Sequence, residues 1–65
     1  MGRDDFLSRK LEKLVNSGIV LTANFEPQSP ALIAKGVKDK QLDSMPQFIY
    51  TKEGGLLGLN YVPAA

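Results

Sequence analysis

The sequence predicts a small α+β domain in which an N-terminal amphipathic helix packs on a small, mainly antiparallel three-stranded sheet with a C-terminal β-hairpin. Two stretches carry this prediction: apolar residues at helical spacing open the chain, and two apolar runs around adjacent glycines close it. A hairpin needs a further strand or a covering helix to persist in water, so the rest of the chain should supply them. We expect one domain over residues 1–65, with frayed ends at 1–4 and 63–65.

The first helix should begin after Asp4 or Asp5, because either carboxylate suits an N-cap. Gly18 suits the left-handed residue that ends a helix, and Ile19 would make the apolar contact of a Schellman ending. The apolar positions follow the spacing of one helical face: Phe6, Leu7, Leu11, Leu14 and Val15.

Residues 19–26 alternate between two faces, which predicts one half-buried strand closed by Pro27. Ser29 before Pro30 then forms an N-cap and first-turn pair for a short helix over residues 30–35 that stops at Gly36. An alternative makes residues 31–37 a strand, and the sequence leaves it open. Residues 37–46 form the most polar segment, which predicts an exposed connection.

Residues 47–62 predict the hairpin, because apolar runs flank Gly54 and Gly55 and such glycines suit a turn with φ > 0 at both central residues. A turn at Glu53 and Gly54 keeps the same strand faces and stays open. The preferred two-residue turn at the glycines makes the pairs Lys52 with Leu57, Tyr50 with Leu59 and Phe48 with Tyr61.

The predicted core combines the apolar face of the helix with the aromatic face of the hairpin. The rings of the hairpin could instead stack on single-stranded nucleic acid, but packing under the helix is the preferred reading. The core residues we expect are Leu7, Leu11, Leu14, Ile19, Leu21, Phe25, Phe48, Tyr50, Leu59 and Tyr61.

The composition indicates a folded chain that needs help with stability. Hydrophobic residues make up 43% of the sequence, but a chain this short buries only about 60% of its unfolded surface. There is no cysteine to form a disulfide and no histidine to favour zinc, so oligomerisation is the natural source of further stabilisation.

Catalysis is not expected, because the chain lacks the Cys and His that most often act as nucleophile and base. Asp39 and Asp43 could offer oxygen ligands to calcium, but they match no EF-hand loop and solvated charges explain them more simply. We expect no enzyme, metal or cofactor. No apolar run reaches the roughly 20 residues of a membrane span, and a small secreted domain without cysteine is atypical, which favours the cytoplasm.

Nucleic-acid binding is the alternative function, because the basic residues fall into two groups. Residues 10–21 resemble the helix-to-wing junction of winged-helix domains, which implies DNA binding, although the chain has no room for the helices that precede that junction. The net charge of +1 also differs from the strongly basic footprint of such modules. The two groups are Arg3, Arg9, Lys10 and Lys13 on the first helix, and Lys35, Lys38 and Lys40 near the connection.

The preferred function is a small non-catalytic protein-interaction module, a regulatory or accessory protein of the phage type that self-associates and binds another macromolecule. The sheet face opposite the first helix has no second long helix to cover it, so we expect a homo-oligomer, with a dimer as the first guess. The expected interface residues on that face are Val20, Ile49, Leu56 and Val62.

Overall fold

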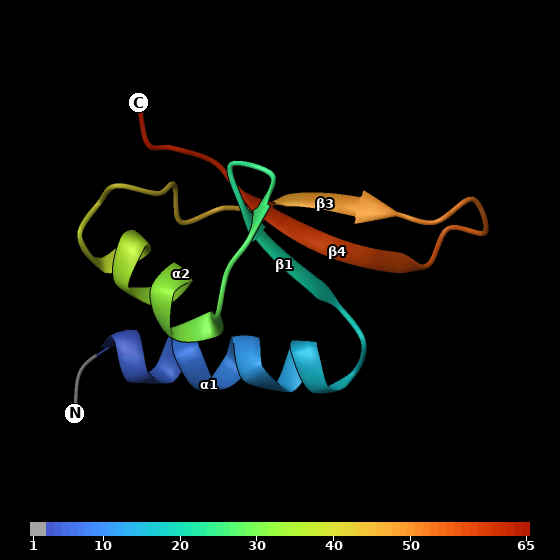
Figure 1. Ribbon diagram of the computed structural model, residues 1–65, viewed down its shortest axis with the longest axis horizontal. Coiled ribbons are helices and arrows are strands. Elements are labelled where there is room, and N and C mark those ends of the chain that lie inside the picture. Colours follow the sequence, from blue (N-terminus) through green and yellow to red (C-terminus); the bar gives the residue numbers. More distant parts are fainter. Residues whose placement is uncertain (1–2) are drawn as a thin grey trace.

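The computed structural model describes the backbone of residues 3–65 and the side chains of residues 6–65, and it confirms the α+β class. It contains two helices and a four-stranded sheet, one strand more than predicted (Figure 1). The elements are α1 (Arg3–Asn16), β1 (Val20–Ala23), β2 (Glu26–Pro27), α2 (Pro30–Lys38), β3 (Gln47–Tyr50) and β4 (Leu56–Tyr61).

Helix α1 ends as the sequence predicts, in a Schellman motif. Gly18 has φ +93°, the N–H of Gly18 donates to the C=O of Val15 at 2.9 Å, and the N–H of Ile19 donates to the C=O of Leu14 at 3.0 Å. The predicted start is wrong by a few residues, since α1 begins at Arg3 and includes both acids predicted as caps.

Helix α2 confirms the helical reading of residues 30–35 and excludes the alternative strand. Ser29 caps it, and its Oγ accepts a hydrogen bond from the N–H of Leu32 at 3.3 Å. The predicted stop at Gly36 is wrong, because α2 continues to Lys38. A Cβ on Gly36 would lie 2.7 Å from Cδ1 of Leu42, so this glycine serves the close packing of the following connection rather than the helix end.

The predicted strand over residues 19–26 is interrupted by a two-residue turn. Asn24 and Phe25 have φ of 51° and 65°, and Ala23 pairs with Glu26, as in a type I′ hairpin. The chain therefore reverses direction after β1 and adds the short outer strand β2. As a result Phe25, predicted in the core, is 71% exposed.

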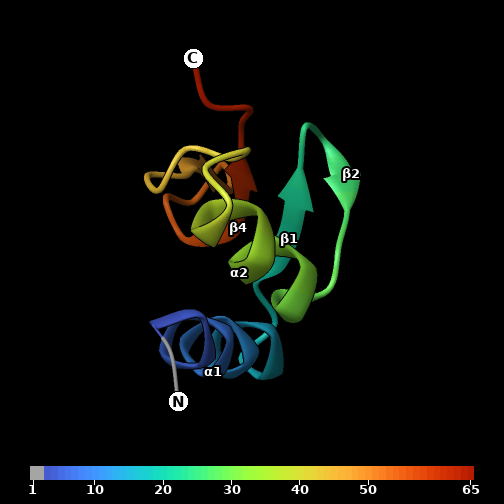
Figure 2. The same ribbon diagram turned by 90° about the vertical axis from the view of Figure 1, so that its left-hand side faces the viewer.

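The strand order is β2-β1-β4-β3, and β1 runs parallel to β4. The predicted sheet is mainly antiparallel, and the parallel central pair is the main departure from it. After β1 the chain forms β2, α2 and β3, and then inserts β4 between β1 and β3. Figure 2 shows β4 next to β1. This central position buries β4 from Gly58 to Tyr61.

The hairpin β3–β4 has the predicted faces but not the preferred turn. Phe48 pairs with Leu59 and Ile49 with Gly58, the register that the open alternative at Glu53 and Gly54 produces. A bulge follows Ile49, and a longer loop is closed by the N–H of Thr51, which donates to the C=O of Gly55 at 2.7 Å. Of the two glycines only Gly54 has positive φ, at +89°.

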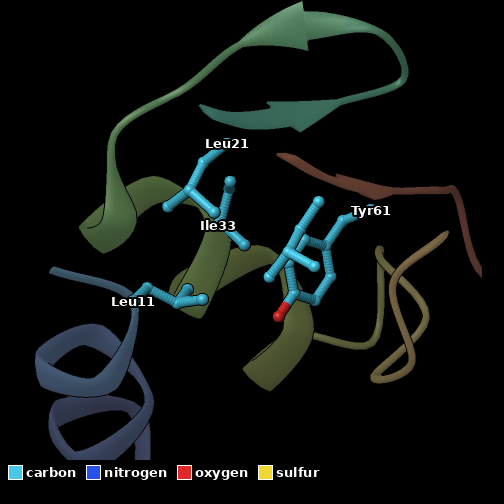
Figure 3. Close-up of a cluster of buried hydrophobic side chains, with 5 residues drawn as sticks. Leu11, Leu21, Ile33 and Tyr61 are labelled. Atoms are coloured by element: carbon cyan, nitrogen blue, oxygen red, sulfur yellow. The ribbon is translucent and has the colours of Figure 1, made fainter. Parts of the chain in front are cut away.

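The core lies between the helices and one face of the sheet (Figure 3). Leu7, Leu14 and Ile19, expected within the core, pack against it but are only partly buried. Two predicted core rings are wrong, since Phe48 is 51% and Tyr50 is 61% exposed. Ile33 of α2, fully buried, fills the core where the rings of Phe48 and Tyr50 were predicted to pack. The fully assembled cluster is Leu11, Leu21, Ile33, Leu59 and Tyr61.

Candidate interaction site

A groove of about 330 Å³ lies between α1 and the β3–β4 hairpin. Its lining is apolar apart from Lys10 and Ser44, and it joins buried core side chains to exposed ones. Such a surface offers apolar contact area with few fixed charges. The lining residues are Leu7, Lys10, Leu11 and Leu14 of α1, Ser44, Met45 and Pro46 of the connection, Phe48 of β3, and Leu59 and Tyr61 of β4.

The groove stays open because α1 packs on α2 and β1 rather than on the hairpin. Figure 1 shows the far end of β3 and β4 projecting beyond both helices. The apolar side chains of that region therefore remain uncovered on the face that the sequence assigned to the core. Phe48, Tyr50 and Leu57 are all exposed on that face, and Met45 is exposed in the connection that precedes β3.

The aromatic side chains of the hairpin separate into a buried and an exposed set. Tyr61 is buried, and the loss of solvation raises the pKa of its hydroxyl above the ordinary value of 10.0. Phe48 and Tyr50 form a tilted pair with ring centroids 6.5 Å apart and an interplanar angle of 34°. This pair is available to a partner, whereas the ring of Tyr61 forms part of the groove wall.

Basic residues of α1 border the groove. Lys10 lines it, and a second hollow of about 300 Å³ is lined by Phe6, Arg9, Lys10 and Lys13. Neither lining contains an acidic residue. The helical spacing of three and four places these side chains on one strip of α1 next to the groove. The side chain of Arg3, also predicted to contact nucleic acid, lies outside the described residues.

The second predicted basic group lies on the other helix. Lys35 and Lys38 belong to the last turns of α2, and Lys40 follows its C-cap with φ 61°. All three are exposed, but none lines either hollow beside α1. Of the described basic residues, only Lys10 thus lines the same groove as a ring of the aromatic pair, Phe48, whereas Lys35, Lys38 and Lys40 lie on or just after α2.

The four predicted interface residues do not form one patch. Val20 and Ile49 pair with Gly58 from its two sides, so all three share the sheet face opposite the helices. Val20 is 50% exposed and Ile49 is half-buried. Leu56 lies opposite Tyr50 at the start of β4. Val62 follows β4 at its other end, where its C=O accepts from the N–H of Asp43 at 2.8 Å.

A buried polar network on the same face holds the β1–β2 turn. Asn60 has no exposed surface, and its Oδ1 accepts from Oγ1 of Thr22 at 2.7 Å and from the N–H of Phe25 at 2.8 Å. Its Nδ2 donates to Oε1 of Gln47 at 3.3 Å. Asn60 is not among the residues expected in the core or at a site, although a lone asparagine among apolar strand residues is typical of a buried group that needs hydrogen-bond partners.

Acidic residues have local structural roles in the described part of the chain. Asp39 is the C-cap of α2, and Oδ1 of Asp43 accepts from the N–H of Met45 at 3.2 Å. Within the described residues, no group of three or more His, Cys, Asp or Glu side chains could hold a metal ion. No described helix is long and apolar enough to cross a membrane.

Comparisons with known proteins give no relative for this fold or this groove. No protein-family model, curated protein or solved structure matches the chain.

Proposed function

We propose that the chain is a non-catalytic protein-interaction module, a cytoplasmic regulatory or accessory protein that self-associates and binds another protein. The apolar groove between α1 and the β3–β4 hairpin is the observation that carries the proposal. Contiguous exposed apolar surface with a polar edge often marks a site of protein interaction.

The lining of the groove has the character of a protein interface. Interface centres are enriched in aromatic residues and methionine and depleted in charge, and Met45, Phe48 and Tyr61 supply those side chains here. Lys10 at the edge gives the charged rim that such interfaces usually have. A partner segment with apolar side chains and flanking acids would match both features.

Peptide binding tests the groove. Peptides selected from a random library on the wild-type chain should lose at least about tenfold in affinity with Phe48→Ala, the effect of one anchor residue worth about 1.4 kcal/mol. Val20→Ala is the matched control, because Val20 is similarly exposed but lies on the opposite face of the sheet. Equal affinity of both variants, with circular dichroism showing both folded, would argue against this site.

Self-association is the second part of the proposal. The chain has no cysteine for a disulfide, and apolar residues are exposed on both sides of its sheet, so burial between copies would stabilise it. Of the four residues expected at the interface, we place Ile49 nearest the contact, with Val20 on the same sheet face on the other side of Gly58. Light scattering at micromolar concentration should give a mass above the 7.1 kDa of one chain. A melting temperature that does not rise with protein concentration would contradict self-association.

Nucleic acid remains the second candidate partner, favoured by Lys10, which shares the groove with the exposed ring of Phe48, and by Arg9 and Lys13, which line the neighbouring hollow with Lys10. Binding to single strands should then weaken as salt rises, with a log–log slope of about −0.7 for each phosphate neutralised. Replacing Lys10 and Lys13 with Gln should reduce that slope, whereas Lys52→Gln on the hairpin loop should not. Salt-independent binding, or no binding, would leave the protein partner as the function.

A further inference from the structure

The two outer strands of the sheet differ in what they offer to another strand. Strand β2 has only two residues, and one of them is Pro27. Such an edge is protected, because it is short and proline has no N–H to donate. Strand β3 has four residues, and no charge or proline occurs between Gln47 and Thr51. It is therefore the open edge of the sheet.

The hydrogen bonds of the hairpin show which backbone groups of β3 face outward. The N–H of Thr51 points toward β4, where it donates to the C=O of Gly55. The bulge after Ile49 lies on β4, since Ile49 pairs with Gly58 and Tyr50 with Leu56, so the extra residue is Leu57. Successive residues of β3 therefore still point their N–H and C=O in opposite directions, and Ile49 also faces β4. Phe48 and Tyr50 must then direct their N–H and C=O to the free edge.

The hydrogen bonds between β4 and β1 lead independently to the same conclusion, that Ile49 faces β4. The C=O of Tyr61 accepts from the N–H of Asn24, and the C=O of Leu59 accepts from Oγ1 of Thr22, so both face the β1 side. Gly58 therefore faces β3 and exchanges hydrogen bonds with Ile49.

From this geometry we propose that a second copy of the chain pairs antiparallel with β3, with the two-fold axis at Ile49. The proposal rests on the self-association put forward above and specifies its surface. Phe48 then lies opposite the second copy's Tyr50. In each of the two Phe48–Tyr50 pairs, the N–H of either residue donates to the C=O of the other. The two four-stranded sheets become one continuous sheet.

Other registers use the edge less well. An axis at Phe48 places Tyr50 opposite Pro46, which cannot donate a hydrogen bond. An axis at Tyr50 places Phe48 opposite Lys52, beyond the end of β3. The axis at Ile49 also brings no like charges together, because the segment around it is uncharged.

The proposed pairing explains the exposure of the two rings. Phe48 and Tyr50 share a strand face, so two copies gather four rings there, next to both grooves. The Ile49 side chains meet on the opposite face, beside Val20. Self-association thus brings the two most exposed apolar side chains of the hairpin, Phe48 and Tyr50, together with those of the second copy and places the two grooves side by side.

Cysteine crosslinking tests the register, because the natural chain has no cysteine. Ile49 and its symmetry mate form the pair without mutual hydrogen bonds, whose Cα atoms lie about 4.5 Å apart, within the about 4.4–6.8 Å that a disulfide spans. Under mild oxidation at micromolar concentration, Ile49→Cys should form covalent dimer about tenfold faster than Val20→Cys, because a paired site has a much higher effective concentration. Non-reducing gels and intact mass measure the product.

A backbone variant tests the edge itself. Tyr50→Pro removes an N–H that faces the free edge and leaves the ladder to β4 intact, so it should shift the chain to monomer in light scattering. Tyr50→Ala is the control, since it removes the same ring but keeps the N–H, and it should dimerise better than the proline variant.

The outcomes separate this inference from the proposed function. If the wild type is a dimer but Ile49→Cys crosslinks no faster than Val20→Cys, β3 pairing is wrong and self-association stands. If the wild type is a monomer at all concentrations, the β3 pairing and the proposed self-association are both wrong. Fast crosslinking of Ile49→Cys supports the pairing even if Tyr50→Pro fails to fold.

Discussion

Replacing Asn60 with alanine should destabilise the protein by about 3 kcal/mol. The two short bonds to Oδ1, at 2.7 and 2.8 Å, each contribute about 1 kcal/mol. The hydroxyl of Thr22 has a second acceptor, the C=O of Leu59 at 3.4 Å, so it is not left without a partner. The N–H of Phe25 has no such substitute, and leaving it unpaired in a part-buried place adds about 1 kcal/mol.

Urea unfolding at one fixed protein concentration measures this change, since self-association would otherwise shift the midpoint. Thr22→Val is the matched control, because it removes one bond to Asn60 and should lower stability by only about 1 kcal/mol. Hydrogen exchange adds a local readout: the amide of Phe25 should exchange faster in Asn60→Ala than in Thr22→Val. A loss no larger than that of Thr22→Val, with unchanged exchange at Phe25, would refute the view that Asn60 holds the turn.

Three further predictions concern the core, the turn and the response to pH. Leu11→Ala should lower stability by about 2–5 kcal/mol, because Leu11 is buried in the core, whereas Phe6→Ala on the exposed side of α1 should change it by less than about 0.5 kcal/mol; equal melting temperatures for the two variants would contradict this core. Phe25→Gly should raise stability by about 0.5–1 kcal/mol, because φ of 65° strains a phenylalanine but not a glycine, and a lower urea midpoint would count against strain at this turn. Burial raises the pKa of Tyr61 in the folded state, so the folded protein keeps that proton to higher pH than the unfolded chain does. Its contribution to stability is therefore complete below pH 10.0 and is lost as pH rises through the higher pKa of the folded state. In urea unfolding measured against pH, Tyr61→Phe should reduce the fall of the midpoint above pH 10.0. The same fall in both proteins would show that another group causes it.

Features with local causes could be predicted from the sequence. The Schellman ending needs only a glycine at position 18 and apolar neighbours, and the start of α2 needs only Ser29 followed by Pro30. The faces of the hairpin follow from the alternation of residues along β3 and β4, so they are correct although the turn is longer than predicted. The groove could be predicted only in part. The sequence places Phe48 on the sheet face toward the first helix, but it predicts that the helix buries this ring, whereas the structure leaves it exposed.

Features that depend on partners distant in the sequence could not be predicted. The turn at Asn24 and Phe25 lacks the glycine that is typical of a type I′ turn. It is held instead by the side-chain amide of Asn60 in β4, which is distant in the sequence and accepts a hydrogen bond from the N–H of Phe25. The insertion of β4 beside β1 makes the centre of the sheet parallel, and no local pattern distinguishes that order from a simple meander.

The sequence by itself determined that the chain opens with a helix, where α1 ends and which residues of the hairpin share a face, because these depend on the spacing of neighbours along the chain. It favoured a helix after Ser29 but left a strand over residues 31–37 open. The tertiary structure alone decided which apolar residues are buried. Helix α2 presents Ile33 to the sheet and α1 packs beside it, so the space available under β4 is filled before the far end of the hairpin is reached. Phe48 and Tyr50 stay exposed for that reason, and the candidate groove and the open edge of β3 are the result of how the elements pack.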